Sequence, residues 1–68
     1  MDAIDIARLS EALAVEERAR KSLSSLIAEL KARRLNDADA KKVRRAVRKW
    51  MRAAKTVANV IGEQVPDN

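Results

Sequence analysis

The feature that most constrains this chain is a heptad pattern in its second half. Apolar side chains recur there at alternating steps of three and four residues: Ala40, Val43, Val47, Trp50, Ala54, Val57 and Ile61. This spacing places them on one side of an α-helix, as in the contact seam of a coiled coil. No Gly or Pro occurs before Gly62, so nothing in the sequence interrupts long helices. The second half therefore predicts one long amphipathic helix.

The first half repeats this pattern with a polar break in its middle. Its seam consists of Ile6, Leu9 and Leu13, followed after a gap by Leu23, Ile27 and Leu30. Glu16 and Arg20 occupy the seam positions in the gap. One interpretation is a continuous helix, with Glu16 and Arg20 paired at the edge of the seam and Ala19 turned inward. The other is a shift of the buried face through Ala12, Val15 and Ala19 to Leu26. We favour the continuous helix, because a buried charge is costly unless it is paired.

The periodicity stops between the two halves, at Leu35-Asn36-Asp37-Ala38-Asp39. Asn36 or Asp37 is suited to cap a new helix, and Asp2 and Asp5 are suited to begin the first one. We expect a single helical-hairpin domain over residues 1–68, with helices at about 2–34 and 38–62, a turn at 35–37 and a frayed tail at 63–68. Gly62 is expected to cap the second helix at its C-terminus.

A short connection between two amphipathic helices favours an antiparallel hairpin. Folding about this turn is expected to place Trp50 near Leu23 and Val57 near Glu16. The predicted fold class is all-α, a coiled-coil-like two-helix hairpin.

The apolar surface of the second helix is wider than one partner helix needs. The seam is flanked by Ala46, Ala53 and Val60 on one side and by Met51 and Ala58 on the other. A chain of 68 residues also buries too little surface to be comfortably stable alone. We therefore expect a homodimer in which two hairpins form a four-helix bundle. Basic residues near the turn and acidic residues near the termini favour an antiparallel dimer.

This plan, with Asp37-Ala38-Asp39 in the turn, is similar to the Rop-type RNA-binding four-helix bundles. The similarity is one of architecture. In that family the RNA-binding face lies on the first helix, whereas the basic side chains here lie on the second. The resemblance therefore assigns no binding residues in this sequence.

The distribution of charge points to the partner. The chain has 15 Lys and Arg against 10 Asp and Glu, and its net charge is +5. Residues 1–34 hold six acidic and seven basic residues, whereas residues 40–62 hold eight basic residues and no acidic one. Seven of these eight form what we call the basic stripe, on the outward side of the second helix: Lys41, Lys42, Arg45, Arg48, Lys49, Arg52 and Lys55.

A face that serves only solubility usually mixes both signs of charge, as the first helix does. The basic stripe therefore predicts a small nucleic-acid-binding or regulatory protein that contacts the phosphates of DNA or RNA. The alternative is a protein-interaction module, such as an adaptor, an inhibitor or an assembly subunit, that binds an acidic or helical partner. A basic helix resting on an anionic membrane is a third interpretation, but alanine and valine offer little to insert.

Composition argues against several other classes of function. The chain has no Cys and no His, which removes disulfides, the usual zinc ligands and imidazole bases. Glu16 and Glu17 are adjacent and point about 100° apart on a helix, so they do not converge as an acid and base pair. Trp50 lies in the seam and is expected to be a core residue. We expect no enzyme activity, no cofactor, no metal and no membrane span, and a cytoplasmic location.

Overall fold

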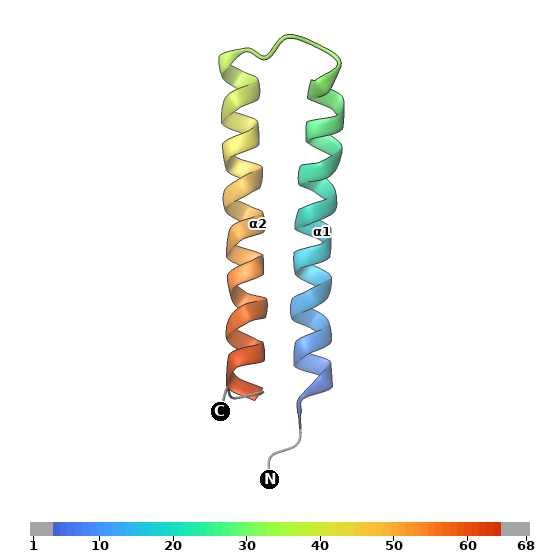
Figure 1. Cartoon of the computed structure of the whole chain (residues 1–68), viewed down its shortest axis with the longest axis vertical. Coiled ribbons are helices and arrows are strands. Elements are labelled where there is room, and N and C mark those ends of the chain that lie inside the picture. Colours follow the sequence, from blue (N-terminus) through green and yellow to red (C-terminus); the bar gives the residue numbers. More distant parts are fainter. Residues whose placement is uncertain (1–3, 65–68) are drawn as a thin grey trace.

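The computed structural model describes residues 4–64 as two long helices joined by residues 32–36 (Figure 1). The helices are α1 (Ile6–Lys31) and α2 (Asp37–Gln64). They lie side by side and antiparallel, so the connection is at one end and both chain ends are at the other. The described residues contain no strand. The all-helical hairpin predicted from the sequence is confirmed.

The ends of the helices differ in detail from those expected. Asp5 caps α1, and its Oδ1 accepts a hydrogen bond of 3.0 Å from the backbone N–H of Arg8. Asp2, the other predicted starting residue, and most of the predicted tail lie outside the described residues. α1 ends at Lys31 rather than near residue 34.

The prediction that Gly62 caps α2 is wrong. α2 continues through Gly62 to Gln64, and Gly62 does not have the positive φ of a left-handed cap. The last turn of α2 is held against the start of α1. Gln64 Oε1 accepts a hydrogen bond of 2.6 Å from the backbone N–H of Asp5, and Glu63 forms an ion pair of 2.6 Å with Arg8.

The side chains that face the other helix follow a heptad on each helix. On α1 these buried or partly buried residues are Leu9, Ala12, Glu16, Ala19, Leu23, Leu26 and Leu30. On α2 the corresponding residues are Asp39, Val43, Ala46, Trp50, Ala53, Val57, Val60 and Gln64. The contact between α1 and α2 is therefore a continuous two-column seam, as in a coiled coil.

On α1 one column of the predicted seam is exposed, whereas on α2 the matching column is partly buried at Ala40, Val47 and Ala54 and exposed only at Ile61. Ile6, Leu13, Ile27 and Ile61 were expected to be buried, but they are 66%, 45%, 41% and 43% exposed. The inward positions belong instead to the preceding column, which includes Ala12, Ala19, Ala53 and Val60. Small side chains there let the two helices approach closely. Each apolar face is three columns wide, and only two columns can face a single partner helix.

The polar middle of α1 is continuous helix and contributes to the contact between the helices. Trp50 Nε1 donates a hydrogen bond of 2.9 Å to Glu16 Oε2, and Arg20 Nε lies 3.2 Å from the same oxygen. Trp50 is partly buried. Ala19 is turned inward as expected, and Arg20 is exposed. Glu16 therefore satisfies the indole N–H of Trp50, a contact absent from the predicted pairing of Glu16 with Val57.

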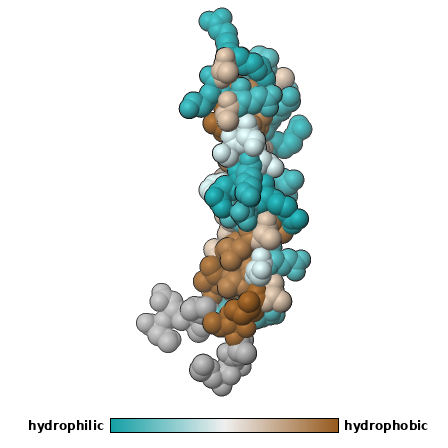
Figure 2. All heavy atoms as spheres, turned by 90° about the vertical axis from the view of Figure 1, so that its right-hand side faces the viewer, coloured by the Kyte–Doolittle hydropathy of each residue, from teal (hydrophilic) through white to brown (hydrophobic). Residues whose placement is uncertain are grey.

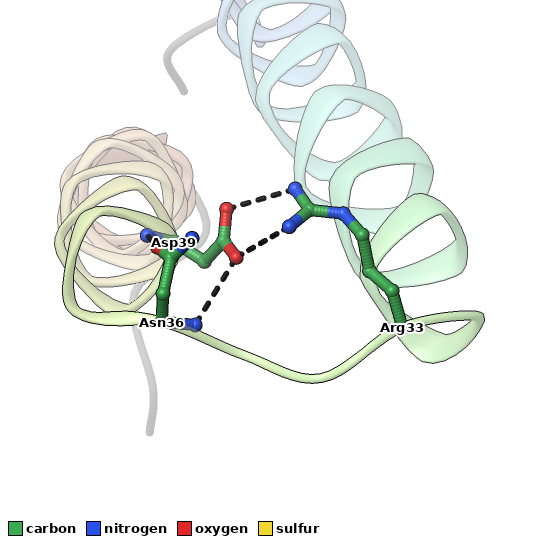
Figure 3. Close-up of polar contacts among 3 residues, drawn as sticks. All are labelled: Arg33, Asn36 and Asp39. Atoms are coloured by element: carbon green, nitrogen blue, oxygen red, sulfur yellow. Dashed lines mark hydrogen bonds and ion pairs between the residues drawn. The ribbon is translucent and has the colours of Figure 1, made fainter.

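A polar cluster fixes the connection between the helices (Figure 3). Asn36 Oδ1 accepts a hydrogen bond of 2.8 Å from the backbone N–H of Asp39, and Asp39 Oδ2 accepts one of 3.2 Å from that of Asn36. This reciprocal pair is a capping box. Arg33 reaches across from the end of α1 and donates to both carboxylate oxygens of Asp39, at 2.7 and 2.9 Å. The start of α2 is therefore tied to the end of α1.

Candidate nucleic-acid interface

All seven residues of the basic stripe lie on α2 and are exposed. Among residues 4–64, none of their side chains forms an ion pair. On α1, by contrast, Arg20 pairs with Glu16 and Lys21 pairs with Glu17. The difference follows from the sequence, because α2 has no acidic residue between Asp39 and Glu63 to pair with a cation one turn away. The positive charges of the stripe therefore face solvent.

Arg44 extends the basic stripe. Lys41, Arg44, Arg45 and Arg48 line a surface hollow of about 170 Å³. Arg44 is not among the residues predicted for the stripe. The sequence did contain a signal for Arg44, because it directly precedes Arg45. Two adjacent cations on a helix make its charged face wider. Four cations around one hollow are suited to hold an anion such as a phosphate.

The remaining stripe residues spread along and around α2. Arg52 and Lys55 continue the outward side at the same three-residue and four-residue spacing. Lys49 lies on the side toward α1, where it lines a second hollow of about 390 Å³ with Arg18 and Ser22. Lys42 is seven residues before Lys49 and therefore lies on the same side of the helix. The interface is a broad basic surface rather than a single row.

The charge of the whole hairpin is concentrated toward the connection. Residues 19–49, the half nearest the connection, include eleven basic and three acidic residues. Residues 4–18 and 50–64, the other half, include four basic and five acidic residues. Figure 2 shows the same polarity on the α1 side, with hydrophilic side chains toward the connection and hydrophobic ones near the chain ends.

Asp39, the acidic residue that precedes the stripe in the sequence, is paired with Arg33 rather than with a cation of the stripe. The pKa of Asp39 is lowered, mainly by its hydrogen bond with Arg33 and also by the nearby charge of Lys42, against the opposing effect of burial. The same hydrogen bond raises the pKa of Arg33. The carboxylate of Asp39 is buried and faces Arg33, so it leaves the outward side of α2 positive.

Comparisons with protein-family models, curated proteins and solved structures gave no match to this chain. Over residues 4–64, neither helix has an apolar stretch long enough to cross a membrane. The same residues bring no three His, Cys, Asp or Glu side chains together in a way that would hold a metal ion. The basic surface of α2 is therefore the strongest candidate site.

Proposed function

We propose that this chain binds nucleic acid through the basic stripe together with Arg44. The observation that carries the proposal is that eight cations lie within residues 40–62 without a single carboxylate, and that all eight are exposed. Lys and Arg side chains placed in this way displace the counterions that surround a phosphate backbone. Release of those counterions drives binding at low and moderate salt.

The dimensions of the surface suit several phosphates of one strand. From Lys41 to Lys55 the helix rises about 21 Å. Phosphates of one strand of duplex DNA are spaced about 3.4 Å apart along its axis, so the surface is as long as about six of them. The guanidinium and ammonium groups reach outward on flexible side chains, which suits contacts to a backbone of irregular shape.

The proposed contacts are to phosphates rather than to bases. Proteins that hold single strands by stacking use exposed aromatic rings, and Trp50 is the one aromatic residue of this chain. Its indole N–H is already bonded to Glu16 within the hairpin. Phosphate contacts position a protein on a nucleic acid but do not read its sequence. We therefore expect binding with little preference for base sequence.

The proposal includes self-association into a dimer of hairpins. The buried apolar residues among those described are three alanines, Leu30 and Val60, and none of them is completely shielded from solvent. This is a small core for two helices of 26 and 28 residues, and short chains usually add stability by pairing. The dimer is a four-helix bundle with the basic surfaces on its outside.

The proposal is tested by reversing three charges at the centre of the stripe, with Arg45→Glu, Arg48→Glu and Arg52→Glu in one chain. Fluorescence anisotropy with labelled duplex DNA, single-stranded DNA and RNA would measure affinity at low salt. We expect a loss of at least about 100-fold, because three phosphate contacts become repulsive. Circular dichroism checks that the helix content is unchanged.

The matched control is the chain with Lys21→Glu, Lys31→Glu and Arg34→Glu, which changes the net charge equally but leaves α2 and the hollows beside the stripe intact. This control is expected to bind within a few-fold of the wild type. A folded stripe variant that retains wild-type affinity would refute the proposal. A wild-type protein that ignores all three nucleic acids, but binds an acidic polypeptide through the stripe, would assign an acidic protein partner instead.

A further inference from the structure

Large apolar side chains that the hairpin leaves uncovered gather on one of its long faces. We call this face the apolar flank; its apolar members are Ile6, Leu13 and Ile27 of α1 with Val47, Ala54 and Ile61 of α2. Exposed Arg20, which pairs with Glu16, lies between Leu13 and Ile27 on the same face. The apolar α1 members and Ile61 are 41–66% exposed, and Val47 and Ala54 are partly exposed.

The contacts between the helices show that both halves of the flank share one face. Arg8 directly precedes the inward residue Leu9, Glu63 directly precedes the inward residue Gln64, and Arg8 and Glu63 form an ion pair. The positions preceding these inward residues therefore meet on one face of the hairpin. The inward residues of each helix form two columns, and Leu9 and Gln64 belong to one of them. Members of the flank directly follow residues of the second column: Leu13 follows Ala12, and Ile61 follows Val60. They therefore meet on the opposite face.

We propose that a second copy of this chain covers the apolar flank, with the two hairpins antiparallel. The flank runs along most of both helices, from Ile6 to Ile27 on α1 and from Val47 to Ile61 on α2, so its occupant needs an equally long apolar face. A copy of the same hairpin has the matching length and the matching apolar face, as a two-fold symmetric interface requires.

The charge of the two halves selects the orientation. A parallel dimer would place the half with eleven basic and three acidic residues beside its own copy. An antiparallel dimer places it beside the half with four basic and five acidic residues. Like charges side by side disfavour an interface and opposite charges favour it. The antiparallel dimer therefore buries the flank without placing the two most basic halves side by side.

Symmetry then determines which helices touch across the interface. If the two-fold axis lies in the interface and is perpendicular to the helices, the two hairpins are antiparallel. In that case α1 packs on α1 of the partner and α2 packs on α2 of the partner. A two-fold axis along the helices makes them parallel and stacks α2 on α1 of the partner. Only the antiparallel dimer sets the two basic stripes next to each other, on one edge of the bundle.

This arrangement leaves the stripe open. Stripe residues Arg45, Arg48 and Arg52 occupy the outward side of α2, whereas the flank residues Val47 and Ala54 occupy the side toward the second copy. Two adjacent stripes form one basic surface with sixteen cations, counting Arg44 of each chain. The joining of the two stripes rests on the proposed nucleic-acid binding, whereas self-association through the flank can be measured without nucleic acid.

Two single-cysteine variants test the orientation, because the natural chain has no Cys. Met51→Cys and Leu35→Cys replace side chains of nearly equal exposure, 57% and 58%. Met51 lies near the middle of α2 beside the flank, and Leu35 lies in the connection. With a short bismaleimide, and without nucleic acid, we expect Met51→Cys to form covalent dimers and Leu35→Cys to stay monomeric on denaturing gels. Self-crosslinking of Leu35→Cys, or none at Met51→Cys, would overturn the antiparallel arrangement.

The face itself is tested by Leu13→Glu, which adds a charge to the flank but not to the seam within the hairpin. Sedimentation equilibrium of the wild type is expected to give twice the chain mass of 7.6 kDa. Leu13→Glu should weaken the dimer by more than tenfold, whereas Leu35→Glu, at an exposed position off the flank, should not. A monomeric wild type, or a Leu13→Glu variant with an unchanged dimer constant, would overturn the proposal whether or not nucleic acid binds.

Discussion

At the scale of single residues, Asp39 fixes where α2 begins. Its buried carboxylate accepts hydrogen bonds from Arg33 and from the backbone of Asn36. A carboxylate taken out of water needs such partners to remain ionised. Because Arg33 belongs to the end of α1, the same contact holds the two helices at the connection. Losing the charge of Asp39 therefore loosens both the cap and the hairpin.

The lowered pKa of Asp39 predicts how the stability of the hairpin depends on pH. Its folded-state pKa lies below the reference of 3.8, so the unfolded chain takes up a proton first on acidification. The stabilisation is present above about pH 4 and is lost as the pH falls through the folded pKa. The pKa of Arg33 is raised above its ordinary value, mainly by its hydrogen bond with Asp39, so its contribution is lost only at strongly alkaline pH.

Urea unfolding of the wild type and Asp39→Asn between pH 7 and pH 2 measures this effect. We expect the wild type to be more stable at pH 7 and the difference to shrink below about pH 4. Asp37→Asn, at an exposed position two residues away, is the control and should show a small difference at every pH. A wild-type advantage that stays constant down to pH 2 would contradict this role for Asp39.

Glu16 shows what a residue-by-residue analysis of the sequence missed. A charge in a heptad seam was interpreted as a pair with Arg20 at the edge, and that pair is present. Its second partner, the indole N–H of Trp50 on the other helix, depends on the relative alignment of the helices. A tryptophan in the facing seam was the available signal, since a buried indole N–H usually finds an acceptor.

At the scale of the helices, the sequence predicted both helices and the hairpin but not the rotation of each helix about its axis. Each helix has three adjacent columns of apolar residues, and each column repeats every seven residues. Either adjacent pair of columns could form the seam and still follow a heptad. On α1 the inward residues Ala12, Ala19 and Leu26 belong to the alternative interpretation, the shifted buried face, whereas Val15 of that interpretation is exposed. Close packing of two long helices favours small inward residues, and this leaves the larger ones for the apolar flank.

The helical conformation of Gly62 leads to a prediction opposite to that of a glycine cap. A side chain at Gly62 would meet no atom within 4 Å. Gly62→Ala is therefore expected to stabilise the hairpin by about 0.5 kcal/mol, since glycine is a poor helix former. Ala58→Gly, at an exposed position one turn earlier, is the reciprocal control and should destabilise by a similar amount. Thermal unfolding followed by circular dichroism measures both, and destabilisation by Gly62→Ala would indicate a left-handed cap.

At the scale of the whole molecule, charge and apolar surface are sorted onto different faces. The outward side of α2 is basic, and the seam joins α1 to α2. The apolar flank lies on one long face of the hairpin, along the line where the two helices meet. Charge was predictable because the run from Lys41 to Lys55 has no acidic residue, so the exposed surface of this part of α2 is basic whichever of its apolar columns face α1. The hollow that includes Arg44 was not predictable, because it depends on how neighbouring side chains are placed.

The measurement that tests the central claim most directly is the salt dependence of nucleic-acid binding. For a duplex, the logarithm of the binding constant falls with the logarithm of salt concentration with a slope of about −0.9 for each phosphate contact. Five or six contacts along the stripe predict a slope of about −5 for the wild type, and Arg48→Gln should make it less steep by about one. A slope near zero, or one that Arg45→Gln and Arg48→Gln leave unchanged, would show that the basic stripe is not the binding surface.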